Sequence, residues 1–197
     1  MIAEKLDRRV KRSKALMRDA LIELMKEKPF SEITAKDVTE RADLNRGTFY
    51  LHYNNVFGLL DELENEVVEG FAHMLEETDI RQDGAWEYPL IGHICDYIAE
   101  NPDLCRCLLL NPRSDRLAKK LADIMKQKGQ KVQQKMGLEI ETYKADYIHQ
   151  FIAYGFMGVV KQWLMEEMPL SKEEMMELAE KMVRPIFQIL IPSEKQE

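Results

Sequence analysis

Residues 33–63 read ITAKDVTERADLNRGTFYLHYNNVFGLLDEL and contain two helix starts in close succession. Thr34 can cap a helix together with Asp37 three residues on, so we expect a short helix over about 35–42. Asn45 is also a good N-terminal cap, and a further helix is expected to begin directly after it. About three residues separate the two helices, which is the length of the turn in a helix-turn-helix motif.

Hydrophobic residues flank both helix starts. Ile33 and Val38 stand where a hydrophobic staple joins the residue before the cap to the fourth helical position. Leu44 and Phe49 occupy the same two positions around the second cap. Phe49 is therefore predicted to point into a small core that the short helices share.

Helical periodicity continues on both sides of this stretch. A first helix is expected from about Arg9 to Glu27, with a buried stripe made of Met17, Ala20, Leu21, Leu24 and Met25. After the stretch, one long amphipathic helix is expected to reach Glu77, with Val56, Leu60, Leu63, Val67, Phe71 and Met74 on its apolar side. The segment TDIRQDG, residues 78–84, breaks the pattern.

The remainder of the chain also has helical spacing. Helices are expected over about 89–99, from 102 as a shorter one, over about 115–129, over the apolar segment 143–168 and from 172 onward. Ser171 and Glu174 form a capping box for the last helix. Convincing alternating strands are missing, so the sequence predicts an all-α protein of about nine helices.

Composition restricts the class of protein. The chain has 197 residues, of which 45% are hydrophobic and 32% charged, as in a soluble globular protein. It has neither an apolar run long enough for a membrane span nor the apolar core of a secretory signal at its start, so we expect a cytoplasmic protein without a membrane partner. Cys95, Cys105 and Cys107 lack the paired spacing of a zinc or redox site and are interpreted as reduced core thiols. No catalytic, phosphate-binding or metal-binding motif occurs, so neither an enzyme nor a cofactor or metal is expected.

The charge is divided unevenly along the chain. The net charge is −7. Residues 1–60 carry twelve Lys and Arg against nine Asp and Glu, a balance of +3, which leaves −10 for residues 61–197. Within residues 1–60, six cations lie close together in sequence and form a basic cluster: Arg8, Arg9, Lys11, Arg12, Lys14 and Arg18. Such a cluster can neutralise phosphates, although a solvated helix face explains it as well.

The segment NRGTFYLHY, residues 45–53, has the side chains that a DNA-recognition helix needs. Arg46 can make a bidentate contact to guanine, the commonest specific base contact. Asn45 and Thr48 can hydrogen-bond phosphates at the helix N-terminus, where the free N–H groups also favour anions. Gly47 leaves room for the DNA backbone. Tyr50, His52 and Tyr53 carry donors that can reach phosphate, while Tyr53 can equally belong to the core.

Residues 33–63 resemble the N-terminal domain of the TetR family of transcriptional regulators, and the resemblance covers about 9–63. The family pattern is matched by Thr34, Ala42, Gly47, Thr48, Tyr50, His52 and the Leu59-Leu60 pair. It implies a DNA-binding domain over residues 1–54 and a helical ligand-binding and dimerisation domain over residues 55–197. The DNA-binding residues are expected to be Arg9, Lys11, Arg12, Thr34, Asn45, Arg46, Gly47, Thr48, Tyr50, His52, Tyr53 and Asn55.

Two positions depart from the family pattern. Asp43 stands where the family has a turn glycine, and we expect Asp43 to adopt the left-handed backbone that the turn requires. Val56 stands where the family has a lysine that supports a phosphate contact. Losing that cation would weaken DNA affinity and flatten its salt dependence without changing base readout. Asn54 and Asn55 can partly replace the contact with neutral hydrogen bonds.

The stretches LLLNPRSDRLAKKL and YIHQFIAYGFMGVVKQWL, residues 108–121 and 147–164, resemble the C-terminal domain of a TetR subgroup common in Gram-positive bacteria. The resemblance implies that the last two helices pair with those of a second copy and that the middle helices bind an effector. The dimerisation residues are expected to be Gly155, Gly158, Met175, Leu178, Met182 and Ile186. The ligand-binding candidates are Phe71, Met74, His93, Tyr97, Cys105, Tyr147, Phe151, Tyr154 and Trp163, each of which can also be ordinary core.

The resemblance favours a homodimeric regulator, a repressor of a palindromic operator in double-stranded DNA that an unknown small-molecule effector releases. The alternative is a TetR-like protein with weak DNA binding that acts through a protein partner as a co-regulator. Val56 and the acidic balance motivate this alternative. The two hypotheses differ in the strength and salt dependence of binding to promoter DNA.

Overall fold

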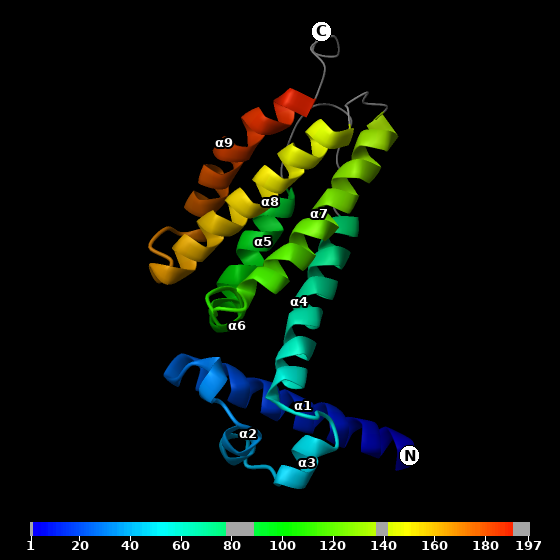
Figure 1. The fold of residues 1–197 in the computed structure, drawn as a ribbon, viewed down its shortest axis with the longest axis vertical. Helices are drawn as coiled ribbons and strands as arrows, with labels where there is room; N and C mark the ends of the chain where they lie inside the picture. Colours follow the sequence, from blue (N-terminus) through cyan, green and yellow to red (C-terminus); the bar gives the residue numbers. More distant parts are fainter. Residues whose placement is uncertain (1, 78–88, 137–141, 191–197) are drawn as a thin grey trace. The chain divides into compact units, whose positions relative to one another are not determined.

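The computed structural model describes residues 2–77, 89–136 and 142–190 (Figure 1). Within these ranges the chain forms nine α-helices and no strand, which confirms the predicted all-α class. No described helix combines the length and apolar character needed to cross a bilayer. The chain divides into two compact units, Met1–Val67 and Val68–Glu197, here called the N-terminal and C-terminal units.

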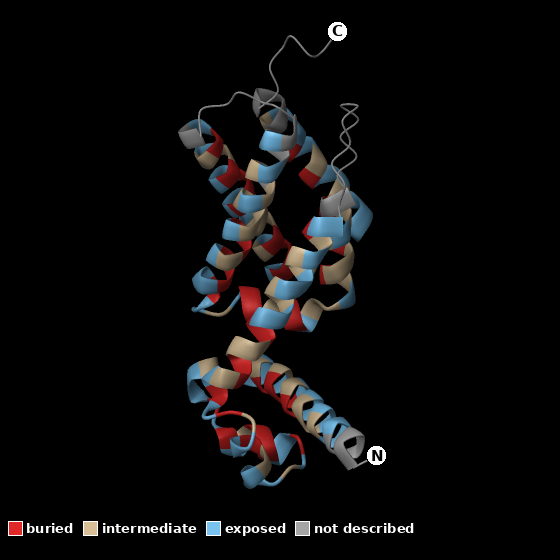
Figure 2. Cartoon of the chain, turned by 90° about the vertical axis from the view of Figure 1, so that its right-hand side faces the viewer, coloured by how far each residue is buried: buried red, intermediate tan, exposed pale blue. Residues whose placement is uncertain are grey.

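The N-terminal unit holds three helices and the start of a fourth. These are α1 (Ile2–Glu27), α2 (Ala35–Arg41), α3 (Arg46–Tyr50) and the first part of α4 (Val56–Glu77), with a short 3-10 helix at Phe30–Glu32 between α1 and α2. α1 thus begins earlier than the expected Arg9. The core of the unit is formed by Met17, Ala20, Leu21, Leu24, Val38, Phe49, Leu59, Leu60 and Leu63 (Figure 2). Phe49 is fully buried, as its staple position predicts.

Local capping fixes both starts of the helix-turn-helix. The Asp37 amide donates to Thr34 Oγ1 (3.2 Å) and the Thr34 amide donates to Asp37 Oδ2 (2.8 Å), which confirms the capping box. The Gly47 amide donates to Asn45 Oδ1 (2.8 Å), so Asn45 caps α3 as expected. These bonds satisfy amides that a helix N-terminus otherwise leaves unpaired.

The turn between α2 and α3 has the left-handed residue that the sequence predicts. Asp43 has φ 52°. Around it the Leu44 amide donates to the Thr39 carbonyl (2.9 Å) and the Asp43 amide to the Glu40 carbonyl (3.3 Å). This bond pair is a Schellman motif, in which glycine usually takes the left-handed position. An aspartate there keeps the turn, because its short polar side chain tolerates that conformation better than most.

The boundary between the units lies inside α4, later than the expected division after residue 54. The first turns of α4 bury Leu59, Leu60 and Leu63 in the N-terminal core. The same turns also pair with α1, because Lys14 contacts Glu62 (2.9 Å) and Arg18 contacts Glu66 (3.3 Å). The start of α4 is therefore part of the N-terminal unit, although the apolar pattern gives no sign of a break there.

The C-terminal unit is built from the rest of α4 and from α5 (Pro89–Glu100), α6 (Pro102–Leu109), α7 (Ser114–Met136), α8 (Thr142–Met165) and α9 (Lys172–Leu190). α8 packs against α6, α7 and α9, and α9 also packs against α5. α7 extends well beyond the expected end near residue 129, since it runs to Met136. The break predicted at residues 78–84 lies outside the described residues.

α8 ends at Met165 rather than at the expected Met168. The Met168 amide donates to the Trp163 carbonyl (2.8 Å) and the Glu167 amide to the Leu164 carbonyl (3.3 Å), a second Schellman motif. Glu167 and Met168 have φ 60° and 57°, so the helix cannot continue through them. The Ser171–Glu174 capping box then starts α9, and it is confirmed by bonds of 2.8 and 3.2 Å.

Candidate nucleic-acid interface

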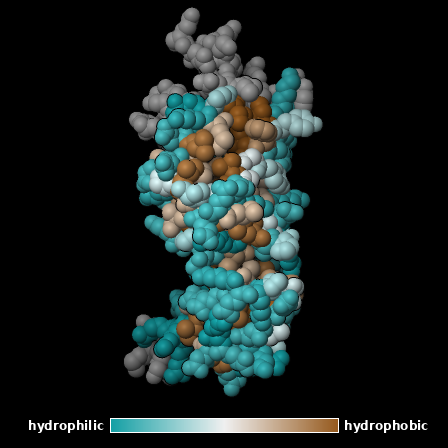
Figure 3. Space-filling view, turned by 90° about the vertical axis from the view of Figure 1, so that its left-hand side faces the viewer, coloured by the Kyte–Doolittle hydropathy of each residue, from teal (hydrophilic) through white to brown (hydrophobic). Residues whose placement is uncertain are grey.

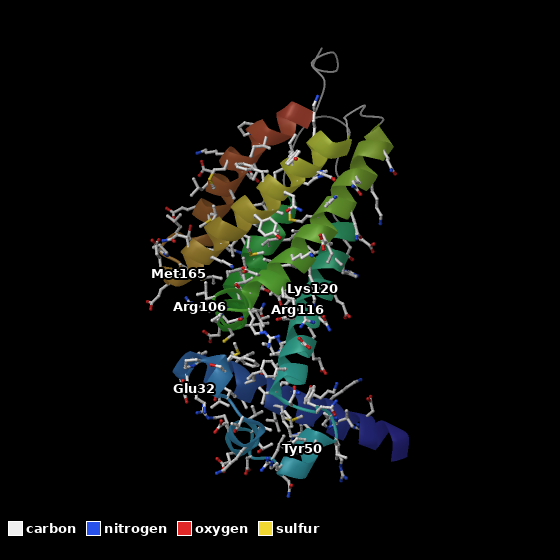
Figure 4. The ribbon with its side chains drawn as sticks, in the orientation of Figure 1. Glu32, Tyr50, Arg106, Arg116, Lys120 and Met165 are labelled. Atoms are coloured by element: carbon white, nitrogen blue, oxygen red, sulfur yellow. The ribbon has the colours of Figure 1, made fainter. Side chains whose placement is uncertain are left out.

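α3 presents one exposed polar pair on the surface of the N-terminal unit. Arg46 Nη2 donates to the Tyr50 hydroxyl (3.2 Å), and the Arg46 guanidinium carbon lies 5.6 Å from the Tyr50 ring centroid. Both side chains are exposed, and Tyr50 can be followed in Figure 4. Arg46 is the first residue of α3, the second helix of the helix-turn-helix, and recognition helices contact base edges through their N-terminal residues. Thr48 and His52 are half-buried beside this pair.

Gly47 directly follows Arg46 in the first turn of α3. A Cβ at this position would lie 3.3 Å from Asn45 Oδ1, the atom that caps α3. A side chain would therefore crowd the cap as well as any backbone that approaches the helix start. The glycine serves local structure in addition to the close approach of DNA that its sequence position predicts.

A groove of about 440 Å³ opens on the same unit, where α2, α3 and α4 begin. Its lining residues are Ile33, Thr34, Ala35, Lys36, Arg46, Tyr50, Asn54, Asn55, Val56 and Phe57. Two cations and several hydrogen-bond donors thus surround an apolar floor. This is the chemistry that holds a phosphate group against a protein surface.

Lys36 is a groove residue that the sequence analysis did not select. Its side chain is exposed and has only a loose ion pair with Glu40 (3.6 Å), also exposed. Such pairs contribute little and open readily. A cation two residues after the Thr34 cap was the available signal. The family pattern instead has its lysine at position 56, where Val56 is buried at 6% exposure and supplies no charge.

The basic cluster on α1 is divided between two roles. Arg9, Lys11 and Arg12 are exposed, and Lys11 pairs with Asp7 (3.0 Å) one turn earlier. Lys14 and Arg18 instead form the ion pairs with α4 described above. Lys14 and Arg18 therefore stabilise the unit, and the exposed members of the cluster stay available for phosphates.

Tyr53 is a correction to the predicted set of DNA contacts. Its side chain is buried in the N-terminal core, with the ring centroid 5.6 Å from Lys14 Nζ. Burial and the nearby Glu62 raise the pKa of its hydroxyl. A side chain in this position cannot reach a phosphate, so the core alternative applies to Tyr53.

Three other predicted contacts already serve as caps. Thr34 donates its hydroxyl proton to Asp37 Oδ2 (2.9 Å), Asn45 caps α3, and Asn55 Oδ1 accepts from the Gly58 amide (3.1 Å) at the start of α4. Each lies on an exposed part of the unit. Their side-chain oxygens are engaged, whereas the amide groups of the two asparagines remain able to donate.

The nine ligand-binding candidates are not brought together. Tyr147, Phe151 and Tyr154 are exposed at 76%, 66% and 47%, so these three do not line an interior site. His93 is exposed too, while Phe71, Met74 and Tyr97 are half-buried. The periodicity of α8 groups the aromatic residues correctly on one face, but that face points outward.

Trp163 and Cys105 are core residues of the C-terminal unit. The Trp163 indole N–H donates to the Leu170 carbonyl (2.9 Å), which closes the turn between α8 and α9. Burial raises the pKa of the Cys105 thiol to about 12 and that of the Cys95 thiol to about 11. Both thiols are free and buried, in agreement with their interpretation as reduced core cysteines. Within the described parts of the chain, no group of three or more His, Cys, Asp or Glu could hold a metal ion.

The exposed aromatic residues of α8 belong to an apolar surface of the C-terminal unit, here called the α8–α9 face. It consists of Tyr147, Phe151, Tyr154, Met165, Leu178 and Met182. Figure 3 shows hydrophobic side chains gathered on one side of this unit, and Figure 4 labels Met165 at the end of α8. Gly155 and Gly158 are exposed on α8, and a Cβ at either would meet open space.

The predicted dimerisation residues fall partly on this face. Leu178 and Met182 are exposed, as an interface requires, and Ile186 is half-buried. Met175 is a correction, because it is almost fully buried within its own chain. Tyr147, Phe151 and Met165 were absent from the predicted interface. Phe151, Tyr154 and Met165 follow Tyr147 by four, seven and eighteen residues, which places all four side chains on one stripe of α8.

Comparisons with known proteins agree with this architecture. Residues 18–63 match the model of the bacterial regulatory proteins of the tetR family, and residues 87–185 match the model of a transcriptional regulator C-terminal region. The uncharacterized HTH-type transcriptional regulator YxbF of Bacillus subtilis (strain 168) is 30% identical over 63 residues. The matched segment is 32% of this chain and 17% of that protein, so the chain spans a small part of that relative's length.

Solved structures share the whole fold. A TetR transcriptional regulator from Streptococcus agalactiae 2603V has a TM-score of 0.64 at 24% identity, covering 92% of this chain and 98% of that one. FadR from Bacillus subtilis, in complex with stearoyl-CoA, has a TM-score of 0.66 at 16% identity, covering 87% and 96%. The fold and the exposed face of α3 define a helix-turn-helix DNA-binding transcriptional regulator. The chain belongs to the TetR family, whose members are transcription regulators and not enzymes.

Proposed function

We propose that this ligand-responsive regulator is a homodimeric repressor that binds a palindromic operator and is released by a small-molecule effector. The observation that carries the DNA-binding part is the exposed Arg46–Tyr50 pair at the start of α3, beside the groove that holds Lys36. The remaining DNA contacts are Arg9, Lys11 and Arg12 on α1, with Asn45, Thr48, His52 and Asn55 around α3. Two such units would read half-sites one helical turn, about 34 Å, apart.

The α8–α9 face supports the homodimer. Phe151 and Tyr147 are about as exposed as polar surface residues, and such contiguous apolar surface usually marks an interaction site. Exposed glycines on the same helix let a partner helix approach closely. A two-fold pairing of this face with its own copy would also match the two-fold symmetry of a palindromic operator.

Release by an effector requires a ligand that binds the DNA-incompetent state more tightly than the competent one. The FadR relative binds stearoyl-CoA. Its likeness to this chain extends to the fold alone, so stearoyl-CoA is a probe to be tested here rather than an assigned effector. Phe71, Met74 and Tyr97 remain candidates for the ligand site, because they are half-buried in the C-terminal unit.

The direct test is footprinting and affinity measurement on DNA fragments flanking the gene, at two salt concentrations. The repressor proposal predicts one protected palindrome, with affinity that falls steeply as salt rises. Binding that is weak and independent of sequence at both salt concentrations would instead support the co-regulator alternative, which the buried Val56 favours. Arg46→Ala is the matched variant, and it should weaken the footprint and relax one base position while the protein remains folded, because Arg46 is exposed.

A further inference from the structure

The interface between α7 and α8 contains polar groups that the fold does not satisfy. Lys126 Nζ on α7 pairs with Asp146 Oδ2 on α8 (2.8 Å). The other carboxylate oxygen, Asp146 Oδ1, is buried and has no hydrogen-bond partner. His149, three residues further along α8, is 8% exposed, and its Nδ1 is also buried without a partner.

The two residues that carry these unpaired atoms are one helical turn apart on α8. Residues three apart on a helix lie on the same face, so Asp146 and His149 share one side of α8, and His149 lies within electrostatic reach of both Asp146 and Lys126. Buried polar atoms in folded proteins are nearly always paired, with protein groups or with ordered water, because an unpaired one is costly. Two adjacent exceptions suggest a polar group that does not belong to the chain.

The charges at this interface balance. The Lys126 ammonium offsets the Asp146 carboxylate. Burial lowers the pKa of His149, and the positive charge of Lys126 acts in the same direction, while Asp146 opposes it. The imidazole is therefore held neutral near pH 7, and the site as a whole carries no net charge. The Lys126 and Asp146 side chains are each 34% exposed, whereas His149 is buried, so a charged guest that reached His149 would lose solvation without gaining a countercharge.

One uncharged group can satisfy both atoms. Asp146 Oδ1 only accepts hydrogen bonds, so the guest must donate to it. A neutral imidazole can present either N–H or a lone pair at Nδ1, so the same group can accept from His149 or donate to it. Hydroxyl and primary amide groups have this combination. A carboxylate cannot donate a hydrogen bond to Asp146 Oδ1. A cationic group would add a positive charge to a site whose charges already balance.

The buried neighbours of His149 on these two helices are small or apolar. Ala145 and Ile152 flank His149 on α8 and are buried, and Ala122 is buried one turn before Lys126 on α7. Small side chains next to an unpaired polar pair suit a ligand with an apolar body and one polar end.

We propose that Asp146 and His149 form the polar anchor of an effector site at the α7–α8 interface, which takes a hydroxyl or amide group carried on an apolar body. This inference rests on the effector response of the proposed function and names its ligand class. Lys126 is a positioning residue, because it holds Asp146 so that Oδ1 stays free. The competing occupant is an ordered water, which would fill the same hydrogen-bonding sites without any regulatory role.

The test compares probes that share an apolar chain and differ in the polar end. Octanamide, octanoate, octylamine and stearoyl-CoA are titrated into the full-length protein, with binding followed by calorimetry and by the ring nitrogen signals of His149 in nuclear magnetic resonance. The expected result is that octanamide binds at least about tenfold more tightly than octanoate or octylamine, as loss of one well-placed hydrogen bond would produce. Octanamide should also shift the His149 signals.

Two variants separate this site from general apolar binding. His149→Phe fills the space with an apolar ring and should weaken octanamide binding by about tenfold or more. His149→Gln restores a donor and an acceptor and should recover part of it. His93→Gln is the control, since His93 is an exposed histidine of the same unit. Circular dichroism and operator binding without any probe report separately on folding and on the DNA-binding function.

Three outcomes would overturn the proposal. Octanoate or stearoyl-CoA could bind as well as octanamide through this pair, octanamide binding could be unchanged in His149→Phe, or no probe could bind. In the last case a His149 signal that exchanges only with water would identify the occupant as solvent. Each of these results leaves the DNA-binding proposal untouched, because operator affinity is measured without a probe.

Discussion

Arg46 Nη2 lies 3.2 Å from the Tyr50 hydroxyl oxygen, one helical turn further along α3. The guanidinium also lies over the Tyr50 ring, with 5.6 Å between its carbon and the ring centroid. The two contacts order a long side chain before DNA arrives, which reduces the entropy lost on binding. They also place Tyr50 in two roles, as a phosphate donor and as a support for the base-reading arginine.

Replacing Tyr50 by phenylalanine separates these roles. The ring stays over Arg46 while the hydroxyl acceptor is lost, so operator affinity should fall by about 0.5–1.5 kcal/mol. Arg46→Ala should cost about 1–3 kcal/mol and relax one base position. If Tyr50 positions Arg46, Tyr50→Phe will also reduce discrimination at that same position. Affinities for the operator and for single-base variants decide this, and equal weakening on all sequences would assign Tyr50 to phosphate alone.

Lys36 offers a second prediction, because it lies in the groove beside the buried Val56. If Lys36 contacts the phosphate that the family lysine would otherwise contact, Lys36→Gln should weaken binding to every sequence similarly. The slope of log affinity against log salt should become shallower by about one. Lys119→Gln is the matched control, since it removes the same charge from an exposed position on α7. An unchanged slope in Lys36→Gln would leave the groove without a phosphate contact at this residue.

Helix starts and turns could be predicted because they depend on neighbours in sequence. Thr34 with Asp37, Ser171 with Glu174, and Asp43 in its turn all form bonds within five residues, so the residue types suffice. The position of Arg46 follows from the cap at Asn45 in the same way.

Whether an apolar face of a helix points into the core or toward the solvent was harder to predict than where the helix begins. α8 has apolar residues on most of its surface, and periodicity groups Tyr147, Phe151 and Tyr154 without showing whether their stripe is buried. Packing of α8 against α6, α7 and α9 decides this, and it depends on residues far apart in sequence. Tyr53 is similar, since a tyrosine can serve as core or as surface donor, and its packing against Phe49 and Lys14 in the folded unit distinguishes the two.

Because of the capping box of α2, the free energy of unfolding is expected to fall when the pH becomes acidic. The Lys28 ammonium, 2.9 Å away, and the hydrogen bonds from Thr34 lower the pKa of Asp37 to about 2. A carboxyl group with a lowered pKa in the folded state stabilises it above the unfolded pKa of about 4. That contribution shrinks as pH falls from about 4 through about 2, and it is gone only below the folded-state pKa, where Asp37 is protonated in both states.

Asp37→Asn should therefore lower the free energy of unfolding by about 1 kcal/mol at pH 7, the usual scale of a helix cap. The difference from the unsubstituted protein should shrink as pH falls through this window. Urea unfolding at a series of pH values measures both quantities. Asp123→Asn, at an exposed position on α7, should show neither effect. A pH-independent loss in Asp37→Asn would mean that the carboxylate charge is not what stabilises the helix start.

The α8–α9 face leads to a prediction about oligomeric state. Phe151 is 66% exposed at the middle of the aromatic stripe of α8, so Phe151→Glu should not disturb the core of a single chain. In a two-fold dimer the same substitution appears twice near the symmetry axis, where buried like charges repel and lack partners. We expect Phe151→Glu to convert the dimer into a folded monomer.

Analytical ultracentrifugation with circular dichroism checks this, and Leu51→Glu is the matched control. Leu51 is 81% exposed in the N-terminal unit, and Leu51→Glu also replaces an apolar side chain by a charged one. Leu51→Glu should remain dimeric. The monomeric Phe151→Glu should also bind a full palindrome no better than a half-site, because only the dimer links two recognition helices and raises their effective concentration on DNA. A dimer that survives Phe151→Glu would exclude the α8–α9 face as the interface.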